Sequence, residues 1–209
     1  MAIDDLLDEH EQSERVLAWL RSNGAGLIGG IVLGLAAIGG WKWWESRDLQ
    51  LKAGQADRYQ VALSAIESKD KAAADKVKAL GAGTYGNLAA LELAKSQVEA
   101  GQRDAAIATL RAIKSDDVAT TSVVNERLAS LLIDAKQADA AIKLLATASS
   151  VGELETRGDA QYALGQREQA RTSYQQALGK LDVGSPRRRL LELKLIEVGG
   201  KPASTEVKS

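Results

Sequence analysis

The chain of 209 residues contains no cysteine. This absence excludes disulfide bonds, thiol catalysis and zinc sites that are built on thiolates. It also excludes a lipid attached to an N-terminal cysteine, which is the anchor of bacterial lipoproteins. The absence does not by itself identify the cellular compartment.

Histidine is nearly absent, since His10 is the only one and lies in an acidic N-terminal segment. The rest of the chain therefore has no residue for a Ser-His-Asp or Cys-His arrangement or for a histidine-based metal site. Acidic pairs such as Glu153 and Glu155 do occur, but two acids on a helix surface are ordinary. We expect no catalytic residue, no metal and no cofactor.

The chain also lacks an excess of charge of either sign, with a net charge of −1. A nearly neutral protein gives no electrostatic reason to bind nucleic acid. We interpret the basic cluster Arg187, Arg188 and Arg189 as a solvated surface; a contact with lipid headgroups is the alternative.

Charge is missing altogether from Ser22 to Trp41, a stretch that lies between Arg21 and Lys42. A helix of about twenty residues spans the roughly 30 Å hydrocarbon core of a bilayer, and a single apolar run must cross it as a helix. The long acidic leader predicts a signal anchor that is not cleaved. We expect a short acidic segment over 1–21 and a transmembrane helix over 22–44.

Tryptophans stand at both ends of this run. Tryptophan favours the bilayer–water interface, where one side of the ring is apolar and the other wet. The predicted interface anchors are Trp19, Trp41, Trp43 and Trp44.

Three glycines, Gly26, Gly30 and Gly34, recur at four-residue spacing inside the run. They lie on one face of a helix and allow another helix to approach closely. The spacing does not say whether the packing partner is a second copy or another membrane protein.

The remainder of the chain has only Pro186 and Pro202 as prolines, no phenylalanine and no alternating strand pattern. Its apolar spacing is helical. Three similar segments centre on Ala106, Ala141 and Ala170, which are separated by 35 and 29 residues. Self-similarity at this period predicts stacked pairs of helices.

The finer pattern resembles the tetratricopeptide repeat. Twelve positions before each central alanine comes a small residue, four positions after it comes a bulky one, and glycine marks two of the turns. The repeat signature comprises Ala94, Gly101, Ala106 and Leu110; Ala129, Ala141 and Leu145; and Gly158, Gly165, Ala170 and Tyr174.

A weaker unit precedes these three, with Ala62 and Ala74 at the small positions. Ser185 and Pro186 favour a helix start, and the helix that follows would cap the stack. The fold expected is all-α: one N-terminal transmembrane helix, then over 45–198 a tetratricopeptide-like α-solenoid of about three to four helix pairs with a C-terminal capping helix. Residues 199–209 are expected to form a disordered tail.

The chain resembles a bacterial family, the YfgM-like ancillary subunits of the Sec translocon. Asn23-Gly24, Leu33-Gly34 and the run from Gly40 to Trp44 resemble the family's anchor. The segments Thr84–Ala94 and Lys136–Ala141 resemble its repeats. The likeness covers roughly residues 10–198, with anchor and repeats in the same order.

The resemblance implies a single-pass protein of the bacterial inner membrane, with a cytoplasmic N-terminus and a periplasmic repeat domain for protein–protein interaction. Its partners would be the Sec channel subunits, a membrane-anchored periplasmic chaperone of the prolyl-isomerase type (PpiD-like), and exported client proteins. The lipid bilayer would hold the anchor, nucleic acid would not bind, and no catalytic residues carry over.

Charges near the span favour the opposite orientation by one residue. Arg15 and Arg21 precede it, whereas Lys42, Arg47 and Lys52 follow it. The positive-inside rule is weak for long domains, and we follow the resemblance. A cytoplasm-facing repeat adaptor or regulator is the alternative, and a membrane-bound enzyme is a third hypothesis.

Overall fold

A computed structural model describes the backbone of residues 2–201 and the side chains there, except those of residues 2–12, 48, 51 and 52. The side chains of His10 and of the first part of the acidic segment, and the whole tail beyond residue 201, therefore lie outside what the structure describes. Contacts divide the chain into two compact units, which meet between Gly54 and Gln55.

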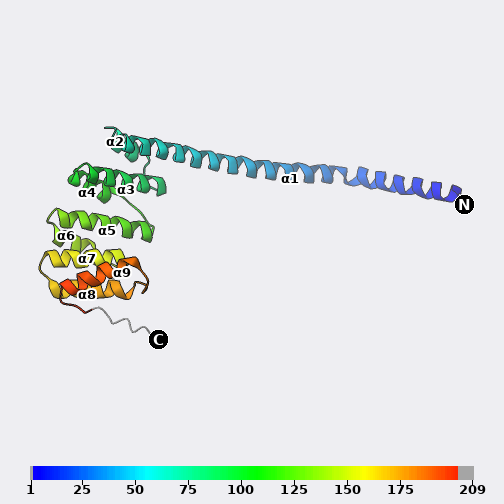
Figure 1. Ribbon diagram of the computed structural model, residues 1–209. Coiled ribbons are helices and arrows are strands. Elements are labelled where there is room, and N and C mark those ends of the chain that lie inside the picture. Colours follow the sequence, from blue (N-terminus) through cyan, green and yellow to red (C-terminus); the bar gives the residue numbers. More distant parts are fainter. Residues whose placement is uncertain (1, 202–209) are drawn as a thin grey trace, which may run out of the picture. The chain divides into compact units, whose positions relative to one another are not determined.

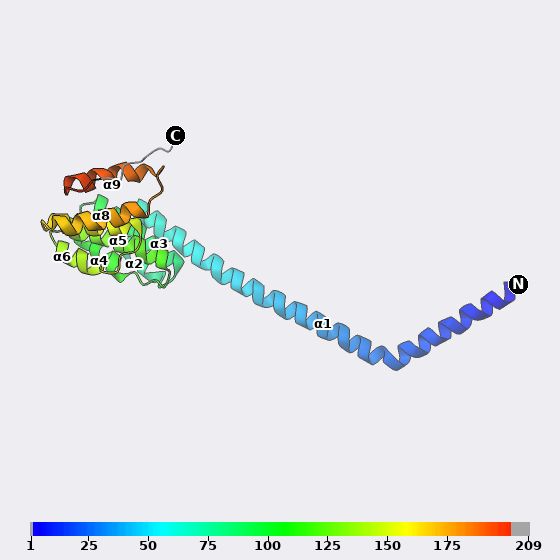
Figure 2. The same cartoon turned by 90° about the horizontal axis from the view of Figure 1, so that it is seen from below.

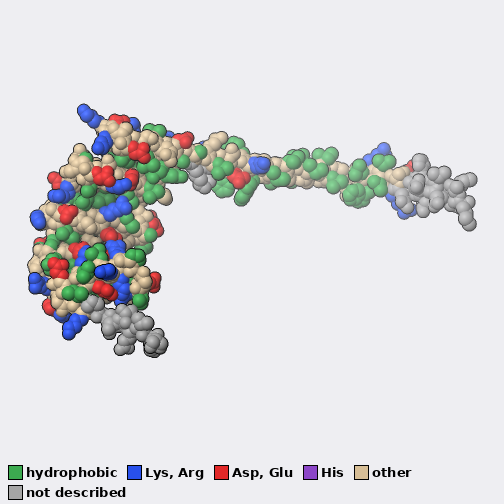
Figure 3. All heavy atoms as spheres, in the orientation of Figure 1, with side chains coloured by type: hydrophobic (Ala, Val, Ile, Leu, Met, Phe, Trp, Pro, Cys, Tyr) green, Lys and Arg blue, Asp and Glu red, His purple; other side chains and the backbone are tan. Residues whose placement is uncertain are grey.

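The first unit consists of most of helix α1, which runs without a break over Ala2–Glu67. Within it, Ser13–Arg47 is the one described stretch long and apolar enough to cross a membrane, and none of it is buried. Figure 3 shows this part of α1 covered mainly by apolar side chains and backbone. The last turns of α1 belong to the second unit.

The second unit stacks helices in chain order (Figures 1 and 2). The end of α1 pairs with α2 (Ala73–Ala79), α3 (Thr84–Glu99) with α4 (Arg103–Ala112), α5 (Val118–Asp134) with α6 (Ala138–Leu144), and α7 (Val151–Ala163) with α8 (Arg167–Gly179). Helix α9 (Pro186–Glu197) packs on α8. We call the two helices of each pair the first and the second helix.

Every first helix, and α9 after them, ends in the same left-handed turn. The turn residues are Lys69, Gly101, Lys136, Gly165 and Gly199, with φ between 54° and 82°. Each donates its N–H to the carbonyl three residues earlier, and the next N–H donates to the carbonyl five residues before it, at 2.8–3.1 Å. This Schellman arrangement satisfies the free carbonyls of the helix end and reverses the chain.

The two helices of a pair touch at a residue with little or no side chain. It lies seven positions before each turn residue, at Ala62, Ala94, Ala129 and Gly158. The alanines are at most 3% exposed. Small residues at this position allow the backbones to approach closely, so that the bulky residue of the second helix reaches the core of its repeat.

In the last pair that bulky residue is Tyr174, and its size explains the glycine opposite. A Cβ added to Gly158 would lie 2.3 Å from Cε1 of the Tyr174 ring. In the two preceding pairs the bulky residues are Leu110 and Leu145, and alanine is tolerated. The central alanines, Ala106, Ala141 and Ala170, are fully buried.

Helix α9 is the last helix of the described residues, and it lacks the small residue. Glu192 stands seven positions before Gly199 and forms an ion pair with Arg188, whose Nε lies 3.0 Å from the carboxylate. A charged pair at this position leaves no room for another second helix. On the opposite side Leu191, Leu195 and Val198 are buried against the last repeat.

The all-α fold with an N-terminal apolar helix and tetratricopeptide-like repeats is thus confirmed, with four helix pairs and α9 in the described residues. One detail of the weak first unit is wrong. Ala62 is buried as expected, but Ala73 rather than Ala74 packs into the core. Helix α2 begins four residues after its turn residue, whereas the other second helices begin two residues after theirs, so the same distance from the turn falls on a different face of the helix.

The contact between Gly158 and Tyr174 can be tested by a double-mutant cycle on urea unfolding of the full chain in mild detergent. Gly158→Ala forces a methyl group into the ring and should lower the free energy of unfolding by about 1–2 kcal/mol. In a Tyr174→Leu background the same substitution should be neutral or stabilising, because alanine favours a helix over glycine. Equal destabilisation in both backgrounds would show that the ring does not impose the glycine.

Candidate partner-binding groove

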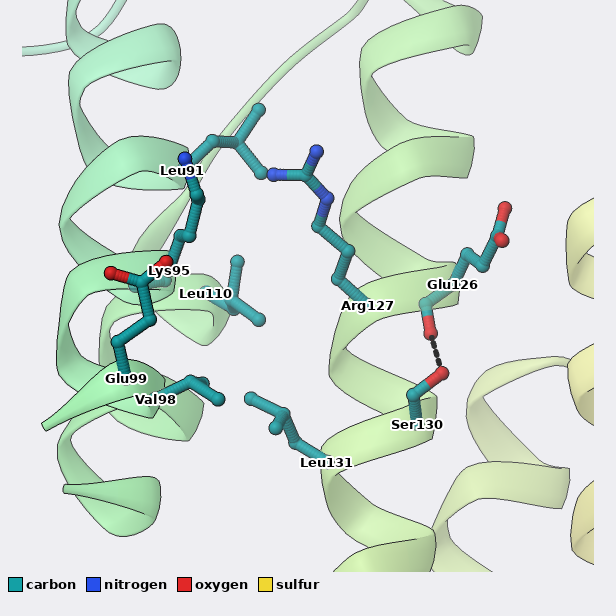
Figure 4. A pocket seen from close by; sticks show the side chains of 10 residues that line it. Leu91, Lys95, Val98, Glu99, Leu110, Glu126, Arg127, Ser130 and Leu131 are labelled. Carbon is teal, nitrogen blue, oxygen red and sulfur yellow. Dashed lines mark hydrogen bonds between the residues drawn. The ribbon is translucent and has the colours of Figure 1, made fainter. Parts of the chain in front are cut away.

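An open cavity of about 400 Å³ lies between the first helices α3 and α5. Its apolar lining comes from Leu91, Ala94 and Val98 of α3, Leu110 of α4 and Leu131 of α5. Figure 4 shows Val98 and Leu131 pointing toward one another from the two helices. We call this cavity, with its rim, the α3–α5 groove.

Charged and polar side chains form the rim of this groove. Lys95 and Glu99 come from α3, and Glu126, Arg127 and Ser130 come from α5. In Figure 4 the Arg127 side chain extends from α5 toward α3, while the Ser130 hydroxyl donates to the backbone carbonyl of Glu126 at 2.9 Å. An apolar floor with charges at its mouth suits a peptide that offers one apolar side chain beside polar groups.

A second cavity, of about 410 Å³, continues along the same helix faces toward the end of α1. It shares Lys95 and Glu99 with the α3–α5 groove and adds Tyr59 and Leu63 from the end of α1. Lys95 forms a 3.0 Å ion pair with Glu92, and this hydrogen bond is the main cause that raises the pKa of Lys95. The lysine therefore stays cationic at the junction of the two cavities.

The other end of the stack carries an ion network that ties α9 to the repeats. Arg187 Nε donates to Glu155 at 2.7 Å, and a terminal nitrogen of the same arginine donates to Glu126 at 3.1 Å. Lys194 Nζ donates to Glu155 at 2.7 Å and to Asp159 at 2.8 Å. Because Glu126 also lines the α3–α5 groove, the network links that groove to α9.

Neighbouring residues leave room for this network and complete it. A Cβ on Gly152 would lie 1.8 Å from a carboxylate oxygen of Glu126, so any other residue at this position would displace the carboxylate. The Tyr174 hydroxyl donates to Asp159 at 2.8 Å, and that of Tyr162 donates to Glu197 at 2.6 Å.

Burial alone would raise the pKa of Glu155, whose side chain is 6% exposed. Hydrogen bonds from Lys194 and Arg187 outweigh that effect, and the pKa of the carboxyl lies below its ordinary value near 4.5. The balance is similar for Lys194. Burial lowers the pKa of its ammonium group, but Asp159 and Glu155 raise the pKa by more, so it lies above its ordinary value. The ion pairs therefore persist at neutral pH.

Two interpretations of charged residues from the sequence are wrong. Glu153 and Glu155 are buried rather than on the helix surface. Glu153 closes the N-terminus of α7 in a capping box with Ser150, and Glu155 lies in the ion network. Within the basic cluster, Arg187 and Arg188 are held in ion pairs instead of being merely solvated.

The repeat signature residues lie mainly inside the stack and not at the groove surface. Only Ala94 and Leu110 reach the floor of the α3–α5 groove. The polar rim residues Lys95, Arg127 and Ser130 escaped the sequence analysis because surface charge on a helix carries no signal by itself. Their distance from the turn is the signal that could have found them, because Lys95 and Ser130 both stand six residues before their turn residue.

In the first unit the side chains of the predicted anchor residues are exposed. Trp41 and Trp44 pack edge to face at 6.1 Å between ring centroids, and Arg47 lies 5.6 Å from the Trp43 ring. Trp19 is exposed as well. A Cβ added at Gly26, Gly30 or Gly34 would meet no atom within 4 Å, so the glycine face is free to receive another helix.

The fold and groove define a repeat protein, and one helix of its described part is suited to a membrane. Residues 17–200 match the family model described as a tetratricopeptide repeat-like domain. A solved putative kinesin light chain of Podosopora anserina with TPR-like repeats is similar in fold, with a TM-score of 0.50 and 16% identity over 68% of this chain and 84% of that one.

Related proteins identify the family to which this repeat protein belongs. The chain is 33% identical over 197 residues to the ancillary SecYEG translocon subunit of Escherichia coli K12, covering 90% of this chain and 95% of that protein. It is 28% identical over 199 residues to the protein of the same name in Aggregatibacter actinomycetemcomitans, covering 90% and 97%. The chain belongs to the family of ancillary SecYEG translocon subunits, a family of membrane-anchored repeat proteins.

The ion network predicts a pH dependence of stability. The pKa of Glu155 is lower in the folded chain than in the unfolded chain. The contribution of its carboxylate to the free energy of unfolding is therefore complete above about pH 4.5 and is lost as the pH falls through the folded pKa. Glu155→Gln should lower the free energy of unfolding by about 1–3 kcal/mol at pH 7, and by less below pH 4.5.

Urea unfolding of the full chain in detergent at several pH values measures this. Glu168→Gln is the control, since Glu168 pairs with Arg171 on the surface and should change stability by less than about 0.5 kcal/mol. A Glu155→Gln deficit that stays constant between pH 7 and pH 3.5 would contradict the linkage.

Proposed function

We propose that this protein is an ancillary subunit of the Sec translocon that works as a membrane-tethered interaction platform and not as an enzyme. The observation that carries the proposal is the likeness to translocon subunits over nearly the whole chain, anchor and repeats together. In this function α1 spans the inner membrane over about residues 22–44, with Trp19 on one side and Trp41, Trp43 and Trp44 on the other as interface anchors.

The repeats would stand in the periplasm, where they link the channel to a membrane-anchored prolyl-isomerase-type chaperone and receive exported proteins. The α3–α5 groove supports this role, because its apolar floor and charged rim can hold a side chain of a partner without a covalent step. The glycine face at Gly26, Gly30 and Gly34 would pack against another helix in the membrane.

The alternative is a cytoplasm-facing adaptor with the same repeats, and the charges next to the span favour it. Arg15 and Arg21 stand before the span, against Lys42, Arg47 and Lys52 after it. The two functions differ in the side of the membrane on which the second unit lies.

Topology can be measured with a single cysteine, since the chain has none of its own. Val183→Cys places a thiol in the exposed loop before α9. After permeabilisation of the outer membrane alone, a membrane-impermeant maleimide should label this thiol in whole cells. Protection that disappears only when the inner membrane is broken would place the repeats in the cytoplasm and favour the adaptor.

The groove can be tested by adding a charge to its floor. Val98→Glu should lower recovery of translocon and chaperone proteins at least about fivefold in quantitative affinity purification, because the carboxylate would be desolvated against an apolar partner side chain. The matched control is Val118→Glu, at a valine that is 78% exposed and lies outside the groove lining. Equal recovery with both variants would place the partner surface elsewhere.

A further inference from the structure

Helix α9 is apolar on two sides, although it is the outermost helix of the stack in Figure 2. Leu191, Leu195 and Val198 are buried against the last repeat. On another face Leu190, Leu193 and Ile196 are 53%, 57% and 52% exposed. A terminal repeat element normally has a polar outer face that keeps the stack soluble, so this stripe is a candidate contact surface.

The repeats that the structure describes do not supply the partner. A further helix of the stack would need a small residue where α9 has Glu192, which is engaged with Arg188. The sequence from Pro202 to Ser209 has Val207 as its only large apolar residue, too little to cover three exposed side chains. A second molecule can supply the cover.

The stripe is arranged symmetrically about Leu193. Leu190 and Ile196 lie three residues on either side of it, and Arg189 and Glu197 lie four residues on either side. Residues three and four apart share one face of a helix. This face of α9 therefore reads, from start to end, as a cation, three apolar side chains and an anion.

Such a face is complementary to a second copy of itself in the antiparallel direction. The N-terminal half of one α9 then lies beside the C-terminal half of the other, so that Arg189 of each copy meets the end that carries Glu197, and the apolar stripes face each other. A parallel pair would instead place like charges together. A two-fold contact of this kind uses the same patch on both molecules.

The two charges are also available for this contact. Arg189 has no ion pair among the described residues, whereas Arg187 and Arg188 beside it are both engaged. Glu197 accepts the Tyr162 hydroxyl with one of its carboxylate oxygens, and a carboxylate has further acceptor sites. We propose that α9 is a homodimerisation helix, which pairs antiparallel with α9 of a second copy about a two-fold axis beside Leu193.

A patch of three apolar side chains is small for a stable dimer in free solution. Two copies held in one membrane meet at a raised effective concentration, and a small interface is then sufficient. The proposal goes beyond the translocon role and holds or fails independently of it.

The absence of native cysteine makes the two-fold axis directly measurable. Leu193→Cys in the full-length chain should form a disulfide-linked dimer upon brief oxidation in membranes, because a residue beside the axis meets its own copy within disulfide distance. Val183→Cys, which is also exposed but lies before α9, is the control and should yield at most about a fifth as much. No excess over this control, or an adduct of Leu193→Cys with a different protein, would overturn the proposal.

Charge reversal tests the antiparallel direction on purified full-length protein reconstituted in lipid vesicles, where two copies share one membrane, with energy transfer between donor-labelled and acceptor-labelled copies as the measurement. Arg189→Glu should weaken the dimer about tenfold or more, and Arg189→Glu with Glu197→Arg should restore most of the affinity. Leu193→Asp should give monomer, while Leu88→Asp, at a comparably exposed leucine of α3, should not. Helical content by circular dichroism checks folding; a folded Leu193→Asp variant that stays dimeric would overturn the proposal.

Discussion

The close approach of two helices in each repeat depends on one residue without a bulky side chain, seven positions before a left-handed turn. Ala94, Ala129 and Gly158 occupy this position in the three clear repeats. The turn sets where the second helix starts, and the small residue sets how near it lies. Together they determine the register of every other side chain along the stack, including those of the α3–α5 groove.

That register gives the two ends of the stack different chemistry from equivalent positions. Six residues before the turn stand Lys95 in α3, Ser130 in α5, Asp159 in α7 and Leu193 in α9. At the α3 and α5 end the side chains surround an apolar cavity with charges. At the α9 end the same position is an exposed leucine. One repeating geometry therefore presents two surfaces suited to different kinds of partner.

The ion network holds α9 against the last repeats. Glu155 lies between two cations, and its partners Arg187 and Lys194 both come from α9. A buried pair contributes little net stability compared with apolar packing, but it is costly to break one-sidedly. The network therefore fixes the position of α9, and with it the direction in which Leu193 faces. Glu126 extends this fixation to the rim of the groove.

The sequence by itself determined the class of fold, since the helical period, the spacing of Ala106, Ala141 and Ala170 and the uncharged run after Arg21 are local patterns. It also identified glycine turns at Gly101 and Gly165. It did not identify the turns at Lys69 and Lys136, because lysine has no preference for a left-handed conformation. These two residues are recognised only when the repeats are aligned with one another.

The tertiary structure decided what the charges do. Glu155 and Arg187 are far apart in the chain, and nothing in either neighbourhood marks them as partners; stacking α9 on α8 brings them to 2.7 Å. It also decided that Val98 and Leu131 form a groove while Leu191 is buried and Leu193 is exposed. All four are apolar residues on amphipathic helices, and the face that a helix buries depends on which neighbours it meets, which no local pattern contains.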